Sequence, residues 1–424
     1  MREIRAEALD LSEFVRPGDL VMWGHGTSEP LTLTENLMAQ RHAIGAFRAF
    51  VGVTYSSTLK AEHADTVSFA SYGALGGLQA LHAAGALEVL PGHLSLLPDL
   101  IESGRLTPDV VLMQLSAPNA TGRYSPGLSH DYLAVAARRA RTVIVEVNDQ
   151  IPWTHCDEAF EGLRMDVIVH TSRAPLEVPA GDPSAVEQEI GQRVAALIAD
   201  RAVLQTGIGA LPAAILRSLK HHRDLGLHSG MAGDTVVDLI EAGVITNAHK
   251  SIDPGVSICG LLTGTQRLYG HVHQNPAFGL RPLRYTHAAE VLARVDGLHA
   301  LNSAVEVDLT GQVNAERVGP RYVGAVGGQV DFVRAALRSL GGRAITALPS
   351  TAAGGRVSRI VSQLSGGVVT TARSDADVFV TEWGVADLRG QTLKERARQM
   401  MAIAHPDHRE SLAQAAHALG LGLN

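Results

Sequence analysis

The sequence predicts an α/β protein with open, mostly parallel sheets, and three observations support this prediction. Short apolar runs, mostly rich in β-branched residues, alternate with helical patterns along the chain. Apolar residues make up 46% of the 424 residues and charged residues 19%, enough for packed cores and unlike a disordered chain. The 43 glycines and the low aromatic content of 4% are typical of many tight strand-to-helix turns. This length favours two or three domains of about 150 residues each.

The first half begins with a buried strand over 20–23, after the turn residues Pro17-Gly18-Asp19. Three more short apolar runs predict buried strands over 110–115, 143–147 and 167–169. The patterns between these runs predict helices over 75–87 and 132–139.

A proline-rich segment divides the chain. Residues 173–184 contain three prolines and show no periodicity. The next helix starts with Ser184 as N-cap and Glu187 three positions later, a capping box. Its apolar stripe is formed by Val186, Ile190, Val194, Leu197 and Ile198. We expect two domains of similar type, over 1–180 and 181–424, with the glycine loops in the second.

The second half repeats the alternation of strands and helices. Strands are expected over 203–206, 256–262, 299–301, 305–309 and 377–381, with another beginning at 244–245. Helices are expected over 211–219, 235–242 and 329–340. A final helix begins at Thr392, the N-cap, with Glu395 behind it.

Charge and cysteine content exclude several classes of protein. The net charge of −7 disfavours a general binder of nucleic acid or anionic membranes. Cys156 and Cys259 belong to no CxxC pair, which argues against a disulfide framework and fits a reducing compartment. No apolar run approaches the roughly 18 residues that span a bilayer. The charged N-terminus is unlike a signal peptide. We expect a soluble, cytoplasmic protein.

Two glycine pairs stand between a strand and a helix. The first is Gly207 and Gly209, and the second is Gly327 and Gly328, followed by Gln329. Such glycines let the backbone approach a ligand, and a helix N-terminus offers free N–H donors to an anion or an oxyanion. The alternative is a structural tight turn at each place. The first pair lacks the third glycine of a dinucleotide fingerprint.

A third loop, over 348–356, contains Ser350 and Thr351 followed by two glycines and Arg356. Its hydroxyls and guanidinium could hold a phosphate, and the alternative is an ordinary surface loop.

Two common types of catalytic centre are not supported. The histidine pairs at 221–222 and at 271 and 273 have no partnered Cys, Asp or Glu at a metal-ligand spacing, so no metal site is predicted. The segment Gly226 to Gly230 has its serine one place too late for a GxSxG nucleophile elbow.

Taken together and in order, the motifs resemble the acetyl-CoA hydrolase/CoA-transferase family, close to the butyrate and 4-hydroxybutyrate CoA-transferases. The resemblance extends over nearly the whole chain. The motifs that carry it are Gly24-His25-Gly26 with Glu29-Pro30, the segment 145–150, Gln205 to Pro212, Asp224 to His228, Asn302 to Asn314, Gly327 to Phe332, Leu348 to Thr351, and Val380 to Gly384.

This resemblance implies two open, mostly parallel α/β domains of the CoA-transferase (NagB-like) type, with the active site between them. It implies an acyl-CoA thioester as substrate, no permanently bound cofactor, and a homo-oligomer. In such enzymes a glutamate attacks the thioester, and a mixed anhydride and then a glutamyl-CoA thioester form. The residues implied to bind CoA or the oxyanion are Gly207, Gly209, Gly327, Gly328, Gln329 and Ser350.

The chain departs from the family pattern at the nucleophile. Gly230 stands where the family has its glutamate, and glycine cannot form an acyl anhydride. His287 stands where the family commonly has an asparagine that faces the active site, and an imidazole can take a proton near neutral pH. Ala232 replaces a phenylalanine. Small residues at 230 and 232 predict extra room and a substrate or acceptor bulkier than acetate.

Three retained acids are candidates for other roles. Glu382 matches an active-site glutamate of related acetate CoA-transferases. Glu306 lies in a strand motif where the family accepts Gln or Glu, which indicates a structural role. Asp234 matches an acid already present beside the usual nucleophile, so it is no replacement.

Three functions remain open from the sequence. The first is an acyl-CoA-processing enzyme in which His287 or Glu382 activates water or a small acceptor, without a glutamyl-CoA intermediate. The second is a CoA-transferase that uses another carboxylate, Glu382 or Glu306. The third is a non-catalytic acyl-CoA-binding protein, which the missing nucleophile at Gly230 would explain.

Overall fold

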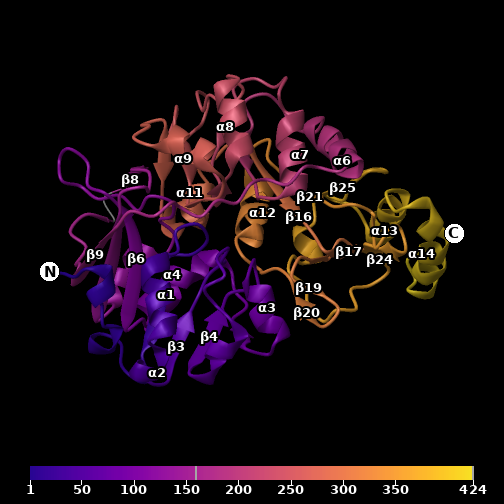
Figure 1. Cartoon of the computed structure of the whole chain (residues 1–424). Coiled ribbons are helices and arrows are strands. Elements are labelled where there is room, and N and C mark those ends of the chain that lie inside the picture. The colour runs from indigo at the N-terminus through magenta and orange to yellow at the C-terminus, as the bar shows by residue number, and fades with distance from the viewer. Residues whose placement is uncertain (158–159, 423–424) are drawn as a thin grey trace.

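The computed structural model describes residues 1–157 and 160–422, and it shows a mixed α/β architecture with two large, mostly parallel sheets (Figure 1). The predicted fold class is therefore confirmed. All strands of the first sheet lie before residue 172, and all strands of the second lie after residue 202. The expected boundary at 180/181 falls in the irregular segment between them and stays a prediction.

The first sheet has eight strands in the order β1-β9-β7-β6-β2-β3-β4-β5, and every neighbouring pair is parallel. The chain runs outward from β2 through β3, β4 and β5, then returns to β6 on the other side of β2. The point where the order reverses lies between β2 and β6. The bounds are β1 Arg2–Glu3, β2 Leu20–Trp23, β3 Phe47–Phe50, β4 Val67–Ser71, β5 Leu87–Val89, β6 Val110–Ser116, β7 Thr142–Asn148 and β9 Val167–Thr171.

The second sheet has six strands in the order β11-β10-β16-β21-β25-β26, and only the β25–β26 pair is antiparallel. Its order reverses between β10 and β16. The bounds are β10 Val203–Gln205, β11 Gly226–Leu227, β16 Leu298–Ser303, β21 Arg343–Ala347, β25 Val378–Thr381 and β26 Gly384–Asp387.

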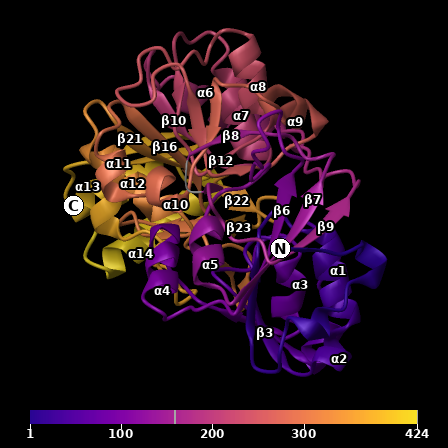
Figure 2. The same cartoon turned by 90° about the vertical axis from the view of Figure 1, so that its left-hand side faces the viewer.

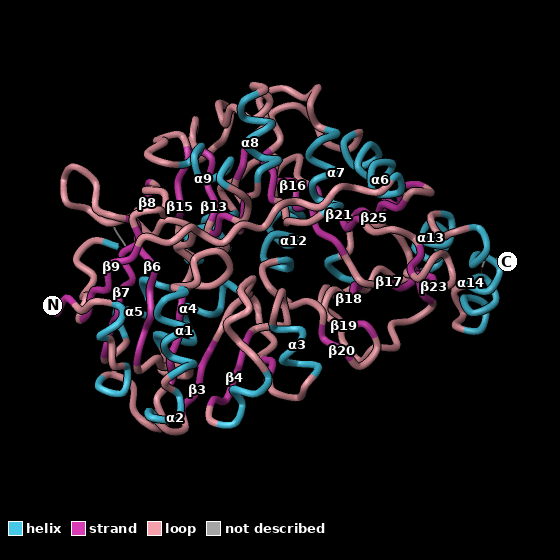
Figure 3. The backbone as a smooth tube through the Cα atoms, in the orientation of Figure 1, coloured by secondary structure: helices cyan, strands magenta, loops and turns pink. Residues whose placement is uncertain are grey.

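Helices cover both faces of each sheet, as a buried parallel sheet requires. In the first sheet, alternate strand residues pack with α1 (Leu31–Ala39) on one face and with α4 (Leu97–Glu102) and α5 (Leu133–Arg139) on the other. In the second, α6 (Ala185–Ala195) and α7 (Ala210–Ser218) cover one face and α12 (Gln329–Arg338) the other (Figure 3). Two layers of core on each sheet explain the high apolar content.

Smaller elements connect the two halves. Strand β8 (His155–Cys156) pairs with β15 (Phe278–Leu280), which pairs with β13 (Ser257–Cys259), so a segment of the first half joins a sheet of the second. Figure 2 shows β6, β7 and β9 on one side of α10 (Leu283–Thr286) and β10, β16 and β21 on the other.

The remaining short strands pair locally. They are β12 (Met231–Ala232) with β14 (Leu261–Leu262), β17 (Glu306–Asp308) with β18 (Val313–Asn314) and β24 (Ile360–Val361), β19 (Arg317–Val318) with β20 (Arg321–Tyr322), and β22 (Thr351–Ala352) with β23 (Val357–Ser358). The remaining helices are α2 (Arg41–Ile44), α3 (Leu78–Ala83), α8 (Asp234–Glu241), α9 (Gln266–Val272), α11 (Ala289–Leu292), α13 (Leu393–Ala402) and α14 (Pro406–Ala418).

Most predicted elements are confirmed within one or two residues, and the capping box at Ser184 forms in full: the Glu187 N–H donates to Ser184 Oγ, and the Ser184 N–H donates to a Glu187 carboxylate oxygen. Five predictions were wrong in detail. The helix over 75–87 is only α3, because Gly85 adopts φ +71° and ends it before β5. Val186 is 39% exposed and lies outside the buried stripe. The strand at 244–245 is a single bridge at Ile245. Pro406 starts a second C-terminal helix, because proline fits the first turn of a helix and not its interior.

The strand predicted over 256–262 is also interrupted. Gly260 separates β13 from β14, and the N–H groups of Gly260 and Leu261 both donate to the Gly230 carbonyl oxygen. This break places Gly260 beside the cavity described below. None of the helices within the described residues is long and apolar enough to cross a bilayer.

Candidate active site

A cavity of about 300 Å³ lies between the two halves, at the points where the strand order of each sheet reverses. Ligands of open α/β sheets bind outside the carboxyl ends of strands at such points. The first half contributes His25, Val53, Tyr55, Tyr72, Leu75, Gly76, Leu94 and Asp131, and the second contributes Gln205, Thr206, Gly207, Ile208, Gly230, Met231, Leu261, His287, Asn302, Gly327, Gly328, Gln329 and Phe332. Gln205 is the last residue of β10 and Asn302 the last but one of β16, and Asn302 Nδ2 donates to Gln205 Oε1 at 3.3 Å.

The ring of His287 packs against the backbone of Gly230 and of Gly328. It follows α10, and its ring contacts Phe332 edge to face at a centroid distance of 4.8 Å. An ideal Cβ built on Gly230 would lie 2.9 Å from His287 Cε1 and 3.0 Å from Nε2, and one built on Gly328 would overlap the ring. Gly328 must therefore be glycine for the imidazole to occupy this place, and a side chain at position 230 would require the ring to shift.

This contact couples the two positions at which we expect the chain to depart from the family pattern. The backbone at Gly230 is not left-handed, so a side chain there is excluded by lack of space and not by strain. The imidazole of His287 fills the volume that a residue with a Cβ at position 230 would need. Glycine at 230 and histidine at 287 form one packed unit.

The environment of His287 keeps its ring neutral. Burial lowers the pKa of His287, and the negative charges of Asp331 and Asp131 only partly oppose this effect. Nδ1 is within 2.8 Å of Thr286 Oγ1. Among the residues that the structure describes, none hydrogen-bonds to Nε2, and the residue lines the cavity. A neutral imidazole with an unbonded nitrogen is suited to accept a proton.

Of the residues predicted to bind CoA, Gly207, Gly327, Gly328 and Gln329 line this cavity, and their role in binding stays a prediction. Gly327 has φ +56°, a conformation that favours glycine, and Gly328 is the N-cap of α12. The first N–H groups of a helix have no partner within it, so this end of α12 is suited to a developing oxyanion.

A buried chain of polar side chains from the first half forms another part of the cavity lining. Asp131 accepts hydrogen bonds from Ser129 Oγ, at 2.5 Å, and pairs with His25 Nε2. His25 Nδ1 is within 3.2 Å of the Tyr72 hydroxyl. Burial raises the pKa of Asp131, but the His25 and Ser129 contacts outweigh it and hold that pKa below its usual value. Asp131 is the only carboxylate that lines the cavity within the described residues.

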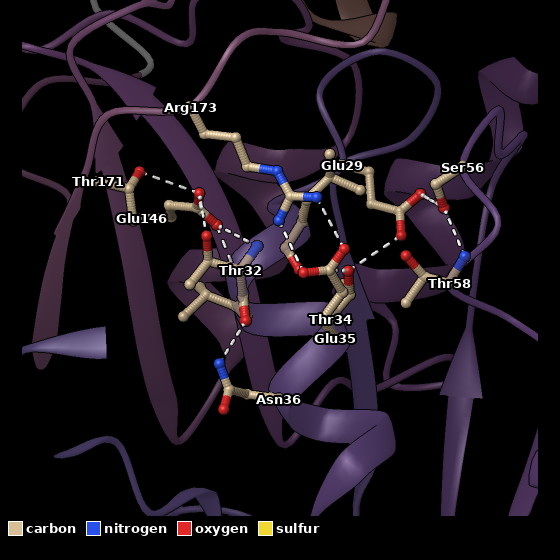
Figure 4. Close-up of polar contacts among 12 residues, drawn as sticks. Glu29, Thr32, Thr34, Glu35, Asn36, Ser56, Thr58, Glu146, Thr171 and Arg173 are labelled. Atoms are coloured by element: carbon tan, nitrogen blue, oxygen red, sulfur yellow. Dashed lines mark hydrogen bonds and ion pairs between the residues drawn. The ribbon is translucent and has the colours of Figure 1, made fainter. Parts of the chain in front are cut away.

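A second buried carboxylate holds the loop that brings Tyr55 to the cavity (Figure 4). Glu29 accepts hydrogen bonds from Thr54 Oγ1 at 2.7 Å, Ser56 Oγ at 2.9 Å and Thr34 Oγ1 at 3.0 Å. Burial raises the pKa of Glu29, and the three hydroxyls oppose that effect. Glu29 therefore fixes the position of the 54–56 loop.

Glu146, which Figure 4 shows on the far side of the Arg173–Glu35 pair from Glu29, caps α1 from β7. Its carboxylate accepts hydrogen bonds from the N–H of Thr32 at 3.0 Å and from that of Leu33 at 3.4 Å. The N-cap residue, Pro30, offers no side-chain cap, so a strand of the sheet supplies one. This ties the start of α1 to the sheet.

Three predicted site residues do not line this cavity. Gly209 lines a smaller cavity of about 220 Å³, which shares Gly207 and Ile208 with the first. Ser350 and Glu382 bond to each other beyond β21 and β25, where the Ser350 N–H donates to Glu382 Oε2 at 2.9 Å. Their predicted roles stay predictions.

The other acids have structural partners. Glu306 Oε1 accepts a hydrogen bond from Asn314 Nδ2 at 3.1 Å, and Asp234 Oδ1 accepts from the N–H of Thr265 at 3.0 Å. Neither residue lines the cavity.

The extra room expected at positions 230 and 232 is not there. His287 fills the space beside Gly230, and Ala232 is fully buried in the hydrophobic core of the second half. These two small residues therefore give no support for a substrate bulkier than acetate.

Sequence reasoning did not identify Tyr72, His25 or Asp131 as site residues. Glycines flank His25 directly after a buried strand, which was a usable signal for a residue at the carboxyl end of the sheet. Asp131 lies in a loop 15 residues after β6, and no local pattern marks it.

Comparison with known proteins agrees with this architecture. The acetyl-CoA hydrolase/transferase N-terminal domain matches residues 4–196, and the C-terminal domain of the same family matches residues 264–416. The 4-hydroxybutyrate coenzyme A transferase of Clostridium kluyveri is 44% identical over 329 residues, 77% of each chain. The butyryl-CoA:acetate CoA-transferase of Anaerostipes caccae is 36% identical over 72% of this chain and 70% of its own.

The crystal structure of RipA from Yersinia pestis superimposes with a TM-score of 0.92 at 32% identity, covering 99% of this chain and 98% of RipA. The similarity thus includes both sheets. The chain therefore belongs to the acetyl-CoA hydrolase/transferase family, and it is an enzyme of the hydrolase or transferase type.

Proposed function

We propose that this protein hydrolyses an acyl-CoA thioester, or transfers its acyl group directly to a small acceptor, without forming a glutamyl-CoA intermediate. The observation that carries the proposal is the packing of His287 on Gly230. A carboxylate nucleophile cannot act from a position that has no side chain, and a neutral imidazole lies in its place.

The residues of the cavity suit a base-assisted attack. His287 Nε2 takes a proton from water as the water oxygen bonds to the thioester carbon. The loops at Gly207 and Gly328 line the cavity, and their N–H groups are the donors that we assign to the oxyanion that develops on the carbonyl oxygen. The carbon–sulfur bond then breaks, and CoA leaves as the thiolate and takes up a proton. An alcohol or amine acceptor would replace water in the same geometry.

Glu382 is the less suitable base, since Ser350 satisfies its carboxylate away from the cavity that contains His287. The test of this choice is the pair of variants His287→Asn and Glu382→Gln. We expect His287→Asn to lose most turnover and Glu382→Gln to keep it.

Labelled water tests the proposal as a whole. Acyl-CoA thioesters of several chain lengths are incubated with the protein in H₂¹⁸O, with and without alcohol and amine acceptors. We expect free CoA together with ¹⁸O-labelled acid or acylated acceptor. His299→Asn is a matched control, because His299 is a buried histidine that does not line the cavity. Intact thioester across the whole panel would overturn the proposal, and CoA binding without turnover would identify a binding protein.

A second candidate function rests on Asp131. If the protein transfers CoA between carboxylic acids, Asp131 is the carboxylate in position to attack, in place of the predicted Glu382 or Glu306. Its hydrogen bonds to His25 and Ser129 make it a poor nucleophile, so this function ranks second. Borohydride or hydroxylamine trapping followed by peptide mass analysis decides it: an adduct on the peptide with Asp131 would establish CoA transfer.

A further inference from the structure

We propose that Ser95 and Asp331 are positioning residues, which hold the loop before α12 against the first half and so fix the place of His287. The inference rests on the proposed function, which assigns His287 as the base and the Gly328 loop as an oxyanion donor. The first half builds one wall of the cavity, which includes Tyr72, and the second half builds a wall that includes His287. The contact between Ser95 and Asp331 joins the two halves.

The two side chains bond to each other next to the lining of the cavity. Ser95 Oγ donates to Asp331 Oδ1 at 2.8 Å, and the Ser95 N–H donates to Asp331 Oδ2 at 3.3 Å. Leu94 and Phe332, their neighbours in the chain, both line the cavity. Because each carboxylate oxygen has a donor from the first half, the contact fixes both the position and the orientation of the carboxylate.

Backbone contacts dock the same loop on the first half. The Leu94 N–H donates to the Gly327 carbonyl oxygen at 3.0 Å, and the Ala74 N–H donates to the Gly324 carbonyl oxygen at 3.0 Å. An ideal Cβ built on Gly73 would lie 2.7 Å from that Gly324 oxygen, so the two backbones are in direct contact there. The loop leads into α12, and the first half therefore helps to set where this helix begins.

The start of α12 in turn supports His287. An ideal Cβ built on Gly328 would lie 2.3 Å from His287 Nε2, and the Phe332 ring contacts the imidazole edge to face. Asp331 lies between these two residues, in the first turn of the helix. A displacement of this turn would move both the N–H groups assigned to the oxyanion and the surface against which the base packs. A misplacement of about 1 Å can cost about 100-fold in rate.

The charge of Asp331 distinguishes this role from a purely structural one. Within the described residues, the titratable groups that act on the His287 ring are Asp331, Asp131, His25 and His228. His228 is neutral, because burial lowers its pKa to about 3. Burial lowers the pKa of His287, and the charges of Asp331 and Asp131 oppose that effect. Removal of the Asp331 charge should therefore lower the pKa of His287 further.

Ser95→Ala tests the contact. This variant removes the hydroxyl donor and leaves the Asp331 charge in place. We expect kcat for acyl-CoA hydrolysis to fall about tenfold while KM stays within about twofold, because the disturbed groups act on the transition state and not on the bound substrate. Steady-state assays of released thiol measure both constants.

Asp331→Asn tests the charge. The amide keeps an oxygen that can accept the Ser95 hydroxyl, but it carries no charge. We expect the acid limb of the kcat/KM profile to move to lower pH by about half a unit or more, and Ser95→Ala to leave this limb in place. A loss of folded protein would lower kcat in either variant without moving the limb.

Asp99→Asn is the matched control. Asp99 Oδ1 also accepts a hydrogen bond across the halves, from Arg284 Nη2 at 2.7 Å, and neither residue lines the cavity. This control should leave kcat and the acid limb unchanged. Hydrogen–deuterium exchange of the peptide that contains Leu94 adds a readout that needs no activity, and Ser95→Ala should speed this exchange because the Leu94 N–H bonds to the loop.

Three results would overturn the inference: a change in kcat below twofold for Ser95→Ala, an equal loss in Asp99→Asn, or an acid limb that Asp331→Asn leaves in place. Unchanged exchange at Leu94 in Ser95→Ala would also contradict it, since the contact would then not hold the loop. If the unmodified protein cleaves no thioester, the proposed function fails, and the exchange at Leu94 still decides whether Ser95 fixes the loop.

Discussion

The two walls of the cavity each present a buried histidine, but the two histidines are bound differently. His287 contacts no carboxylate, its Nε2 has no hydrogen-bond partner among the described residues, and burial lowers its pKa. Both ring nitrogens of His25 have partners, Asp131 and Tyr72. The first arrangement favours taking a proton, and the second fixes the His25 ring in place. Glycine provides the space for the imidazole on both walls, at Gly230 and Gly52.

Replacing His287, whose Nε2 has no hydrogen-bond partner among the described residues, should have the largest effect on turnover. We expect His287→Asn to reduce kcat for acyl-CoA hydrolysis by about 10²- to 10⁴-fold, the usual contribution of a general base. Steady-state assays of released thiol measure it, and His299→Asn controls for the loss of a buried histidine. If His287→Asn retained more than a tenth of the activity, His287 could not be the base that distinguishes it from His25.

A paired substitution should convert one wall to the family pattern. Gly230→Glu alone brings a side chain into contact with His287 and should lower the free energy of unfolding by about 1–3 kcal/mol, as overpacking does. Gly230→Glu combined with His287→Asn removes that contact. We expect only the double variant to transfer CoA to acetate and to yield a trapped glutamyl-CoA adduct. Equal stability and equal transfer by the single variant would show that the two positions are independent.

The pH dependence of turnover should reflect His287. Because burial lowers its pKa, the neutral base persists on acidification below the ordinary histidine value of about 6.5. The acid limb of the kcat/KM profile should therefore lie below pH 6.5 and should disappear from the residual activity of His287→Asn. An acid limb at or above pH 7 would contradict this assignment.

The smallest expected effect concerns the support behind the Tyr72 wall. The raised pKa of Glu29 means that its contribution to stability is complete below about pH 4.3, the unfolded value, and is lost as pH rises through the folded pKa. Glu29→Gln removes this titration. From pH 5 to pH 8 we expect the free energy of unfolding of the unmodified protein to fall by about 1 kcal/mol relative to Glu29→Gln.

Urea unfolding at both pH values measures this difference. Glu35→Gln is the control, because Glu35 lies on α1, six residues after Glu29, in a half-exposed ion pair with Arg173 (Figure 4). Its effect should stay within about 0.5 kcal/mol at both pH values. A pH-independent difference for Glu29→Gln would show that Glu29 keeps the same protonation state in the folded and unfolded protein.

Much of the fold could be predicted, because it depends on local patterns. Buried β-branched runs identified β6 and β7, and the Ser184 capping box identified the start of α6. The exceptions arose where tertiary contacts decide, as at Gly260, which the pairing with Gly230 takes out of its strand.

The site was predictable only where motifs mark it. The glycine loops and the glycine at position 230 could be found in the sequence, but the contact between Gly230 and His287 joins positions 57 residues apart. Asp131 meets His25 across 106 residues, and no spacing in the chain could show that. The fold alone brings these groups together.

The most direct test follows the acyl carbon and the enzyme at once. The protein is incubated with an acyl-CoA in H₂¹⁸O, half of the sample is treated with borohydride, and both halves are examined by mass spectrometry. The account predicts free CoA, an acid or acylated acceptor as product, ¹⁸O in any acid released, and a peptide map without a reduced glutamyl or aspartyl adduct. A trapped adduct on any carboxylate, or a thioester that stays intact, would contradict it.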